Sequence, residues 1–306
     1  MKKLTLLAMI LAVCGSLFSQ QEPQYTLYML NPFLTNPALA GTNNYYQIRT
    51  NHRFQWTGLK DAPITNSISA YGPHSTKSMG YGGTIYNDIT GPTSRTGING
   101  VYAYNIAATP DIRVSMGLSV GIMQYKVDGT KIDLHDDTPD PALQKILYSK
   151  MVPDASMGIY VWNSNFFAGF SALQLLNNKI KLSAEDPDPE LNRLARHFYL
   201  FGGYHYEPTK DLALEPTLII QKVVPAQYQL EFNAKVIYQR MLWGGLAFRT
   251  GDAISLVLGY TYDKYFIGCG YDYAVSSIRQ YTTGSFEFCL GVNFSSLKKA
   301  SGRKKK

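Results

Sequence analysis

The sequence predicts an all-β fold: an antiparallel transmembrane β-barrel of the outer membrane, with about 14 strands and an N-terminal extended plug or arm. Three observations predict it. Apolar and polar residues alternate along most of the chain. Charged residues make up 17% of the 306 residues, below the roughly 25% of soluble domains, whereas tyrosine and glycine are abundant. After an apolar N-terminal signal, no apolar run approaches the ~20 residues that a helical span needs.

Alternation with a period of two indicates strands that have one apolar face and one polar face. In 228–239 the apolar set, which we expect to face lipid, is Tyr228, Leu230, Phe232, Ala234, Val236 and Tyr238. A helix would instead repeat its apolar residues at a spacing of three or four. We expect the opposite set to face the barrel interior.

The same pattern predicts strands at 45–57, 62–72, 79–89, 95–108, 111–125, 154–163, 165–174, 196–207, 210–223, 228–240, 242–250, 253–262, 264–275 and 284–294. Their number is even, as in single-chain outer-membrane barrels, and closure leaves no unpaired edge in lipid. Short turns alternate with longer connections, of which 126–153 and 175–195 are the longest. We therefore expect periplasmic turns, a periplasmic N-terminus and extracellular long loops.

The chain is expected to divide into a signal peptide (1–19), an N-terminal extended arm or plug (20–44), a barrel (45–294) and a basic periplasmic tail (295–306). Two lysines precede an apolar run from Leu4 to Val13, and small residues follow it, as in secretory signals. We expect cleavage after Ser19. Lipoprotein processing at Cys14 is disfavoured, because Val13 is larger than the residue expected there.

The segment 20–44 carries two Asn-Pro pairs and ends near Gly41. Proline lacks an amide donor and favours an extended residue before it, so we expect a kinked, extended segment that cannot pair as an ordinary strand. Its length allows it to enter the lumen as a plug or to lie beneath the barrel as a periplasmic docking arm.

The inward-facing positions include many charged and amide side chains. We expect the lumen to be lined by Arg49, Asn51, Arg53, Gln55, Arg95, Arg113, Glu215, Glu231, Lys235, Arg249, Asp272 and Glu287. Opposite charges fill a narrow lumen by pairing, whereas in a wide lumen they line a water path.

The formal net charge of +7 comes from the two ends of the chain. The signal contributes two lysines and the tail six basic side chains, and the rest sums to −1. Because the basic residues form no face of the barrel, we expect no nucleic-acid partner. The tail either contacts anionic lipid or a periplasmic partner, or it is a disordered, solvated end.

Signatures of soluble enzymes, such as HExxH and CxxC, are missing from the sequence. We therefore expect no enzyme, no catalytic residue, no metal site and no cofactor. Acidic residues in the long loops indicate helix caps and solvated charge, with an extracellular calcium site as the weaker alternative. Asp-Pro pairs at Asp140 and Asp188 predict a short helix in each loop, over 141–150 and 189–198.

Two cysteines follow the signal, Cys269 and Cys289. The alternation places them on opposite faces of their strands, whereas facing pairs on adjacent strands share one face. We expect free thiols.

Four long motifs resemble the PorP/SprF family of the type IX secretion system, found in outer membranes of Bacteroidetes-type bacteria. They are YxLYMLNPFLTNPALAG from Tyr25, RxNHRFQWTGLKDAPIT from Arg49, SxSAYGP from Ser67 and DITGP from Asp88. The resemblance is dense over 24–104. Beyond this range, to the C-terminus, it is looser and lies in the alternating pattern of the strands.

The resemblance implies a component that binds or anchors a secreted, adhesin-like surface protein carrying a type IX (type B) C-terminal domain, and that links it to periplasmic ring or motor components, including those of gliding motility. Partner contacts are expected at Tyr28, Asn31, Pro32, Asn36, Pro37, Gly41, Lys298, Lys299 and Arg303. Cargo contacts are expected at Asp140, Leu143, Ile146, Tyr148, Asp188, Leu191 and Leu194. The alternative is an outer-membrane channel or transporter for a small or hydrophobic solute. The cargo and the stoichiometry stay open.

Overall fold

The computed structural model describes residues 24–131, 147–180, 193–224 and 228–295. The strands are β1 (Tyr45–Phe54), β2 (Ile64–Pro73), β3 (Met79–Thr90), β4 (Thr93–Ala107), β5 (Arg113–Asp128), β6 (Leu147–Trp162), β7 (Phe166–Leu173), β8 (His197–Tyr204), β9 (Tyr206–Thr209), β10 (Leu212–Val223), β11 (Tyr228–Tyr238), β12 (Leu242–Arg249), β13 (Ala253–Tyr262), β14 (Tyr265–Ala274) and β15 (Ser285–Ser295). Short 3-10 helices are η1 (Pro32–Leu34), η2 (Pro37–Leu39), η3 (Gly129–Lys131) and η4 (Ser277–Gln280).

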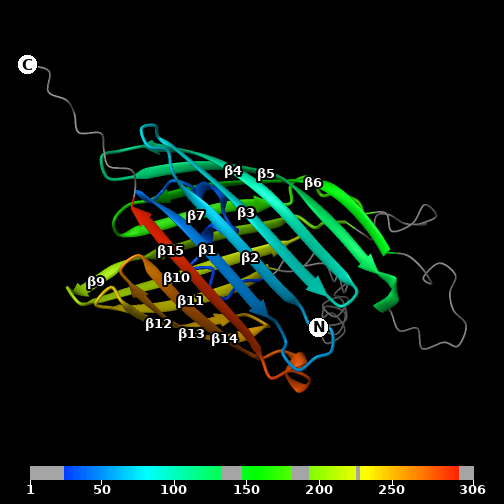
Figure 1. Ribbon diagram of the computed structural model, residues 1–306. Helices are drawn as coiled ribbons and strands as arrows, with labels where there is room; N and C mark the ends of the chain where they lie inside the picture. The colour runs from blue at the N-terminus through cyan, green and yellow to red at the C-terminus, as the bar shows by residue number, and fades with distance from the viewer. Residues whose placement is uncertain (1–23, 132–146, 181–192, 225–227, 296–306) are drawn as a thin grey trace, which may run out of the picture.

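These strands form one closed antiparallel barrel (Figure 1). Apart from β8 and β9, which do not pair with each other, neighbouring strands in the chain are paired, and β1 also pairs with β15 to complete the circle. Because β8 and β9 both pair with β10, they act as two pieces of one strand, so the wall built by the described residues has fourteen strands. Closure leaves no free sheet edge in the bilayer.

The fourteen predicted strands are confirmed, with differences at their ends. β6 begins at Leu147 rather than at 154, because it stays paired with β5 as far as Asp128. The predicted strand at 196–207 is interrupted at His205. The loop helices are wrong where the structure describes them: Leu147–Lys150 belongs to a strand, and so does the chain from His197. In both places strand pairing overrides the local helix signal.

The two ends of the barrel differ in their connections, as expected. At one end, here called the turn end, the strands are joined by 74–78, 108–112, 163–165, 210–211, 239–241 and 263–264. At the other, here called the loop end, lie the connections 55–63, 91–92, 129–146, 174–196, 224–227, 250–252 and 275–284. We keep the predicted orientation, with the turn end in the periplasm.

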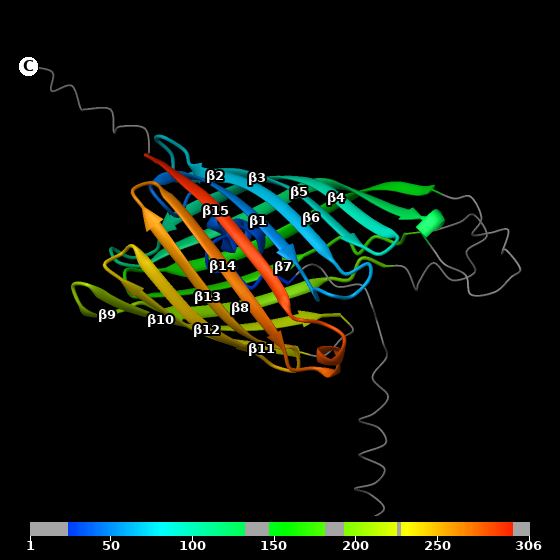
Figure 2. The same ribbon diagram turned by 60° about the horizontal axis from the view of Figure 1, so that its bottom comes forward.

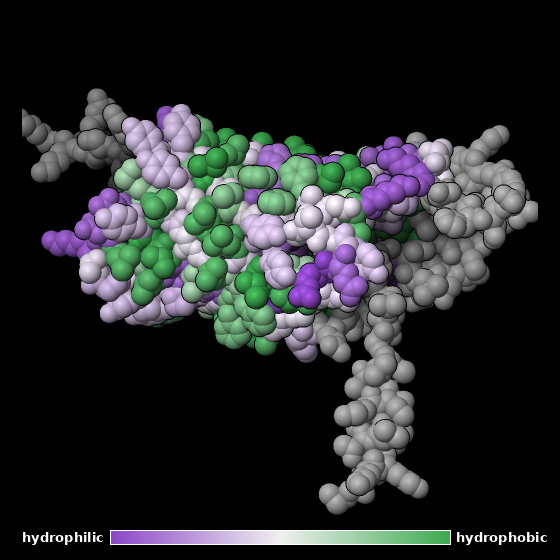
Figure 3. Space-filling view, turned by 90° about the horizontal axis from the view of Figure 1, so that it is seen from below, coloured by the Kyte–Doolittle hydropathy of each residue, from purple (hydrophilic) through white to green (hydrophobic). Residues whose placement is uncertain are grey.

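The outer face of the barrel is apolar along its middle. In Figure 3, hydrophobic side chains gather over the middle of the visible face and hydrophilic ones lie towards its ends. Outward side chains include Leu118, Val120 and Phe232, each more than half exposed outside the wall, and their neighbours in sequence face inward. Among the described residues no helix is both long and apolar enough to cross a membrane.

The two cysteines lie on opposite faces, as the alternation predicts. Cys269 is exposed on the outer face, whereas Cys289 is fully buried inside, and both are free thiols.

The outward face generates a depth-dependent prediction. Leu246, in the middle of β12, is 60% exposed, and Leu242 begins the same strand at the turn end with 54% exposed. We expect Leu246→Lys to lower the free energy of unfolding in lipid by about 2–4 kcal/mol, and Leu242→Lys by about 0–1 kcal/mol. Denaturant unfolding in vesicles measures both. Equal costs for the two variants would contradict the assignment of the bilayer midplane.

Candidate functional site: the filled lumen

Residues Gln24–Asn44, here called the luminal segment, lie inside the barrel (the dark blue chain in Figures 1 and 2). Gly41 lies against Gly80 near the turn end, and Thr26 contacts Asp272 towards the loop end. Ten of its side chains are buried, although the segment makes no strand. It therefore runs along the lumen instead of extending the wall.

Each Asn-Pro pair begins a tight helical turn. Asn31 and Asn36 precede η1 and η2, whose first residues are the prolines, and the side-chain Oδ1 of Asn36 accepts a hydrogen bond from the Ala38 amide at 2.9 Å. Proline suits the first helical position because that amide needs no partner. The expected extended backbone is therefore wrong over Pro32–Leu34 and Pro37–Leu39, which are helical turns, whereas Asn36, the residue before the second proline, is extended as expected.

A buried ionic cluster holds the start of the segment. The Thr26 hydroxyl lies 2.7 Å from the Asp272 carboxylate, and the Thr26 amide donates to Glu287 at 2.6 Å. Arg53 joins the three groups, donating to the Thr26 hydroxyl (2.6 Å), Asp272 (2.7 Å) and Glu287 (3.3 Å). These side chains are almost wholly buried, so a lost partner would leave an uncompensated charge.

Amide side chains hold the rest of the segment. Asn31 donates to Asn51 at 2.8 Å and to Ser69 at 3.0 Å. Asn36 donates to the backbone carbonyls of Ile159 and Phe170 at 3.1 and 3.3 Å. These bonds reach β1, β2, β6 and β7, so the segment is tied to both halves of the wall.

Glycines line the wall where the segment comes closest. A Cβ on Gly117 would overlap the backbone of Pro37 and Ala38, and one on Gly158 would overlap the Asn36 side chain. Gly80 and Gly82 meet Ala40 and the Phe33 ring in the same way. The Phe33 ring also stacks on Tyr71, with centroids 4.2 Å apart. The wall is thus shaped to accept this backbone at close approach.

Most of the predicted lumen residues do lie inside. Arg249 binds Glu231 at 2.7 Å, Lys235 binds Glu215 at 2.6 Å, and each pair joins adjacent strands. Arg95 pairs with Asp88 at 2.7 Å, a partner that the sequence reading missed although DITGP contains it. The residues placed inside and at least partly buried are Arg49, Asn51, Arg53, Arg95, Glu215, Glu231, Lys235, Arg249, Asp272 and Glu287. Gln55 follows the end of β1 at the loop end and is half-buried. Arg113 departs from the set: it begins β5 at the turn end and is exposed.

The predicted partner residues of the segment are mostly inaccessible from outside. Tyr28, Asn31, Asn36 and Pro37 are buried within the barrel, and Pro32 and Gly41 are half-buried there. An external partner has no surface on the buried four while the segment stays seated. Lys298, Lys299 and Arg303 lie outside the described residues.

The predicted cargo residues divide in the same way. Asp140, Leu143, Ile146, Asp188 and Leu191 lie outside the described residues. Leu194 is 2% exposed and packs with Met123, Tyr125 and Ile180 inside the loop end, and Tyr148 packs against this cluster. Leu194 is therefore a core residue of the loop end, since its apolar side chain folds back into the barrel.

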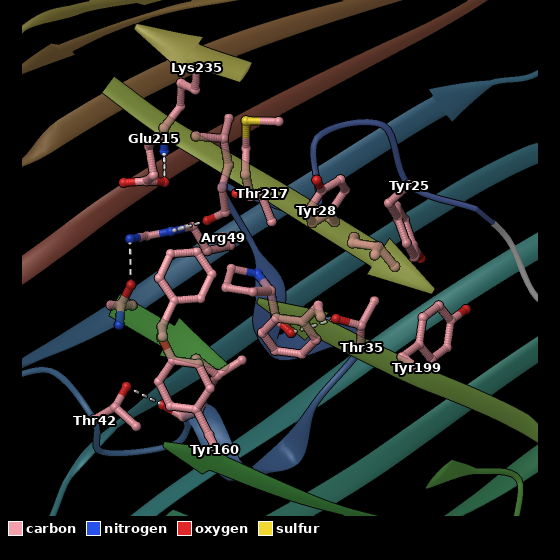
Figure 4. A pocket seen from close by; sticks show the side chains of 18 of the residues that line it. Tyr25, Tyr28, Thr35, Thr42, Arg49, Tyr160, Tyr199, Glu215, Thr217 and Lys235 are labelled. Atoms are coloured by element: carbon pink, nitrogen blue, oxygen red, sulfur yellow. Dashed lines mark hydrogen bonds and ion pairs between the residues drawn. The ribbon is translucent and has the colours of Figure 1, made fainter. Parts of the chain in front are cut away.

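A cavity of about 470 Å³ remains between the segment and the wall, and residues of β1, β2, β6–β8 and β10–β15 line it (Figure 4). Tyr28, Tyr160, Tyr199, Glu215 and Lys235 are among its lining residues. Tyr28 lies outside the membrane-spanning strands, and burial raises the pKa of its hydroxyl well above the usual value, so the hydroxyl stays protonated. Among the described residues no group of three His, Cys, Asp or Glu side chains could hold a metal ion.

Comparison with known protein families shows to which family the chain belongs. Residues 17–292 match the family described as type IX secretion system membrane protein PorP/SprF. The chain belongs to the PorP/SprF family. It is therefore an outer-membrane barrel of the type IX secretion system, and both the family and the fold indicate a non-enzymatic component. No curated protein sequence matches the chain.

Several solved outer-membrane barrels have a similar fold. The Ralstonia pickettii toluene transporter TbuX has a TM-score of 0.51 at 8% identity, covering 87% of this chain and 93% of its own. A Pseudomonas aeruginosa FadL homologue has a TM-score of 0.50 at 11% identity, covering 94% and 97%. The TodX deltaS2S3 mutant, a monoaromatic hydrocarbon channel, has 0.51 at 7% identity, covering 86% and 94%. At these identities the likeness shows the fold alone.

The glycine contacts predict how this PorP/SprF barrel responds to added side chains. We expect Gly117→Val to displace the luminal segment, expose it to protease and lower the free energy of unfolding by about 1–3 kcal/mol, because the new atoms overlap a backbone. Gly100, whose Cβ would meet only the Val120 carbonyl at 4.0 Å, is the matched control. Gly100→Val should stay within about 0.5 kcal/mol. Equal protease resistance of the two variants would contradict the close contact between the luminal segment and Gly117.

The ionic cluster predicts a second pair of variants. Thr26→Val removes the hydroxyl that contacts Asp272 and Arg53, so we expect a loss of about 1–3 kcal/mol in the free energy of unfolding. Thr42→Val removes only a bond to the Leu39 carbonyl within the segment, at 3.0 Å, and should cost less. Denaturant titration compares them, and an undiminished stability of Thr26→Val would show that the cluster does not hold the segment.

Proposed function

We propose that this secretion-system barrel binds a secreted surface protein carrying a type IX C-terminal domain at its loop end, and connects it through its turn end to periplasmic ring or motor components. The luminal segment supports this proposal, because a lumen filled by Gln24–Asn44 favours an anchor over an open conduit. On this proposal the segment acts as a permanent plug, and the two ends of the barrel are the working surfaces.

The described part of the loop end offers apolar surface for a protein partner. Met151 on β6 is 69% exposed, Tyr281 after η4 is 68% exposed, and Leu176 in the connection after β7 is 49% exposed. The β5–β6 hairpin pairs continuously from Arg113–Trp162 to Asp128–Leu147, and so extends beyond the end of β7, whose register with β6 stops at Met157–Ala172. Exposed apolar side chains on a projecting hairpin are typical of a protein-binding site.

Cross-linking tests this proposal directly. A photoreactive amino acid at Met151, Leu176 or Tyr281 should capture an exported protein in intact cells. The same residue at Ser164 or Lys210, both exposed at the turn end, should instead capture a periplasmic component. Mass spectrometry identifies the products. Three loop-end positions that capture no exported protein would overturn the cargo proposal, whatever the turn-end positions capture.

The cavity beside the luminal segment keeps the channel alternative as a second candidate. Planar-bilayer recording separates the two. We expect the full mature chain to be electrically silent, because the segment obstructs the lumen, and a variant lacking 24–41 to conduct. Steady conductance of the full chain would favour the channel. Silence of both proteins would contradict an obstructing role for the segment, provided that the deletion variant inserts as a heat-modifiable barrel.

A further inference from the structure

We propose that the lumen holds a binding site for a small, neutral, hydroxyl-rich solute of mono- or disaccharide size, in the cavity between the luminal segment and the barrel wall. The cavity measures about 470 Å³, within the roughly 300–1,000 Å³ of small-molecule sites. This site is independent of the proposed binding of a secreted protein, which concerns the ends of the barrel.

Two buried polar atoms on the cavity lining have no hydrogen-bond partner among the described residues. One is Oε1 of Glu231, whose other carboxylate oxygen accepts from Arg249 at 2.7 Å. The second is the hydroxyl of Tyr28. Both residues line the cavity and are more than nine-tenths buried, with 6% and 7% of their surface exposed. Since an unsatisfied buried polar atom is costly, a molecule that donates to Glu231 and bonds to Tyr28 would be stabilised there.

The charges around the cavity favour a neutral molecule. Lys235 pairs with Glu215, and Arg249 pairs with Glu231, so neither cation is left for an anionic ligand. Arg49 uses its guanidinium hydrogens on the carbonyls of Leu30, Ile48 and Val292 and the side chains of Gln47 and Asn293. It also stacks on Phe266 at 4.2 Å. Glu231 Oε1 still lacks a hydrogen-bond donor, and a neutral hydroxyl group of a ligand supplies one.

The other lining groups favour a ring with one apolar face and several hydroxyls. Tyr160, Phe167 and Phe201 form an aromatic group, with centroids 6.3 and 6.1 Å from Tyr160, and all three line the cavity. Thr217, Gln221 and Gln229 add hydroxyl and amide groups to the same lining. Figure 4 shows Tyr160, Tyr199 and Thr217 around the space that Tyr28 also borders. A hydrocarbon would fit the aromatic group but would leave Glu231 and Tyr28 unpaired.

Calorimetric titration of the purified full-length protein in detergent tests the site, with D-glucose, sucrose and myo-inositol as probes. We expect one-site binding of at least one probe. Tyr28→Phe should weaken it roughly 2- to 10-fold, the loss of one hydrogen bond, and should fold normally because that hydroxyl has no partner. Tyr102→Phe, on the outer face, should leave binding unchanged.

A second pair of variants tests the location. Thr217→Phe places a ring in the cavity and should abolish binding, whereas Leu218→Phe adds the same bulk to the outward face of the same strand and should not. Failure of all three probes to bind would overturn the proposal. So would binding that neither Tyr28→Phe nor Thr217→Phe weakens, in which case the probe occupies another surface. None of these results depends on the capture of a secreted protein.

Discussion

The fit between the luminal segment and the inner wall is the constraint on which the rest of this structure depends. Where the segment passes, the wall carries glycines, as at Gly117 and Gly158, polar side chains that bond to it, as at Asn51 and Ser69, and side chains that pack on it, as at Tyr71. A larger apolar side chain at those glycines would collide with the segment. The barrel sequence therefore encodes the segment's position as well as its own closure.

The energetics of the interior follow from burial. Arg53, Asp272 and Glu287 are removed from solvent and pair with one another, and the Thr26 hydroxyl and the Thr26 and Leu27 amides add hydrogen bonds to the cluster. Removing one partner of such a group costs more than the whole group contributes over an apolar replacement, so each member depends on the others being in place. This explains how a segment without sheet hydrogen bonds is fixed inside a barrel.

Much of the wall could be predicted from the sequence, because a period of two fixes which face each residue takes. Phe232 and Val236 face outward and Glu231 and Lys235 inward, as the alternation requires. The luminal segment has no such period, so the sequence did not indicate that Thr26 binds β14 and β15. An Asn-Pro pair is compatible with either an extended kink or the start of a helix, and each pair here starts a short 3-10 helix. Where the structure describes the two predicted loop helices, their last residues belong to β6, paired with β5, and to β8, paired with β7 and β10.

Seating of the segment in the lumen is tested most directly by cysteine cross-linking in native outer membranes. Asn31 and Ser69 touch across the interior, their side chains 3.0 Å apart. In a chain with Cys269 and Cys289 replaced by alanine, Asn31→Cys with Ser69→Cys should form a disulfide as completely as Asn87→Cys with Thr96→Cys, a pair on adjacent wall strands 2.8 Å apart. Intact-mass spectrometry without reductant detects the disulfide in each pair. A wall pair that closes while the interior pair stays reduced would contradict the account.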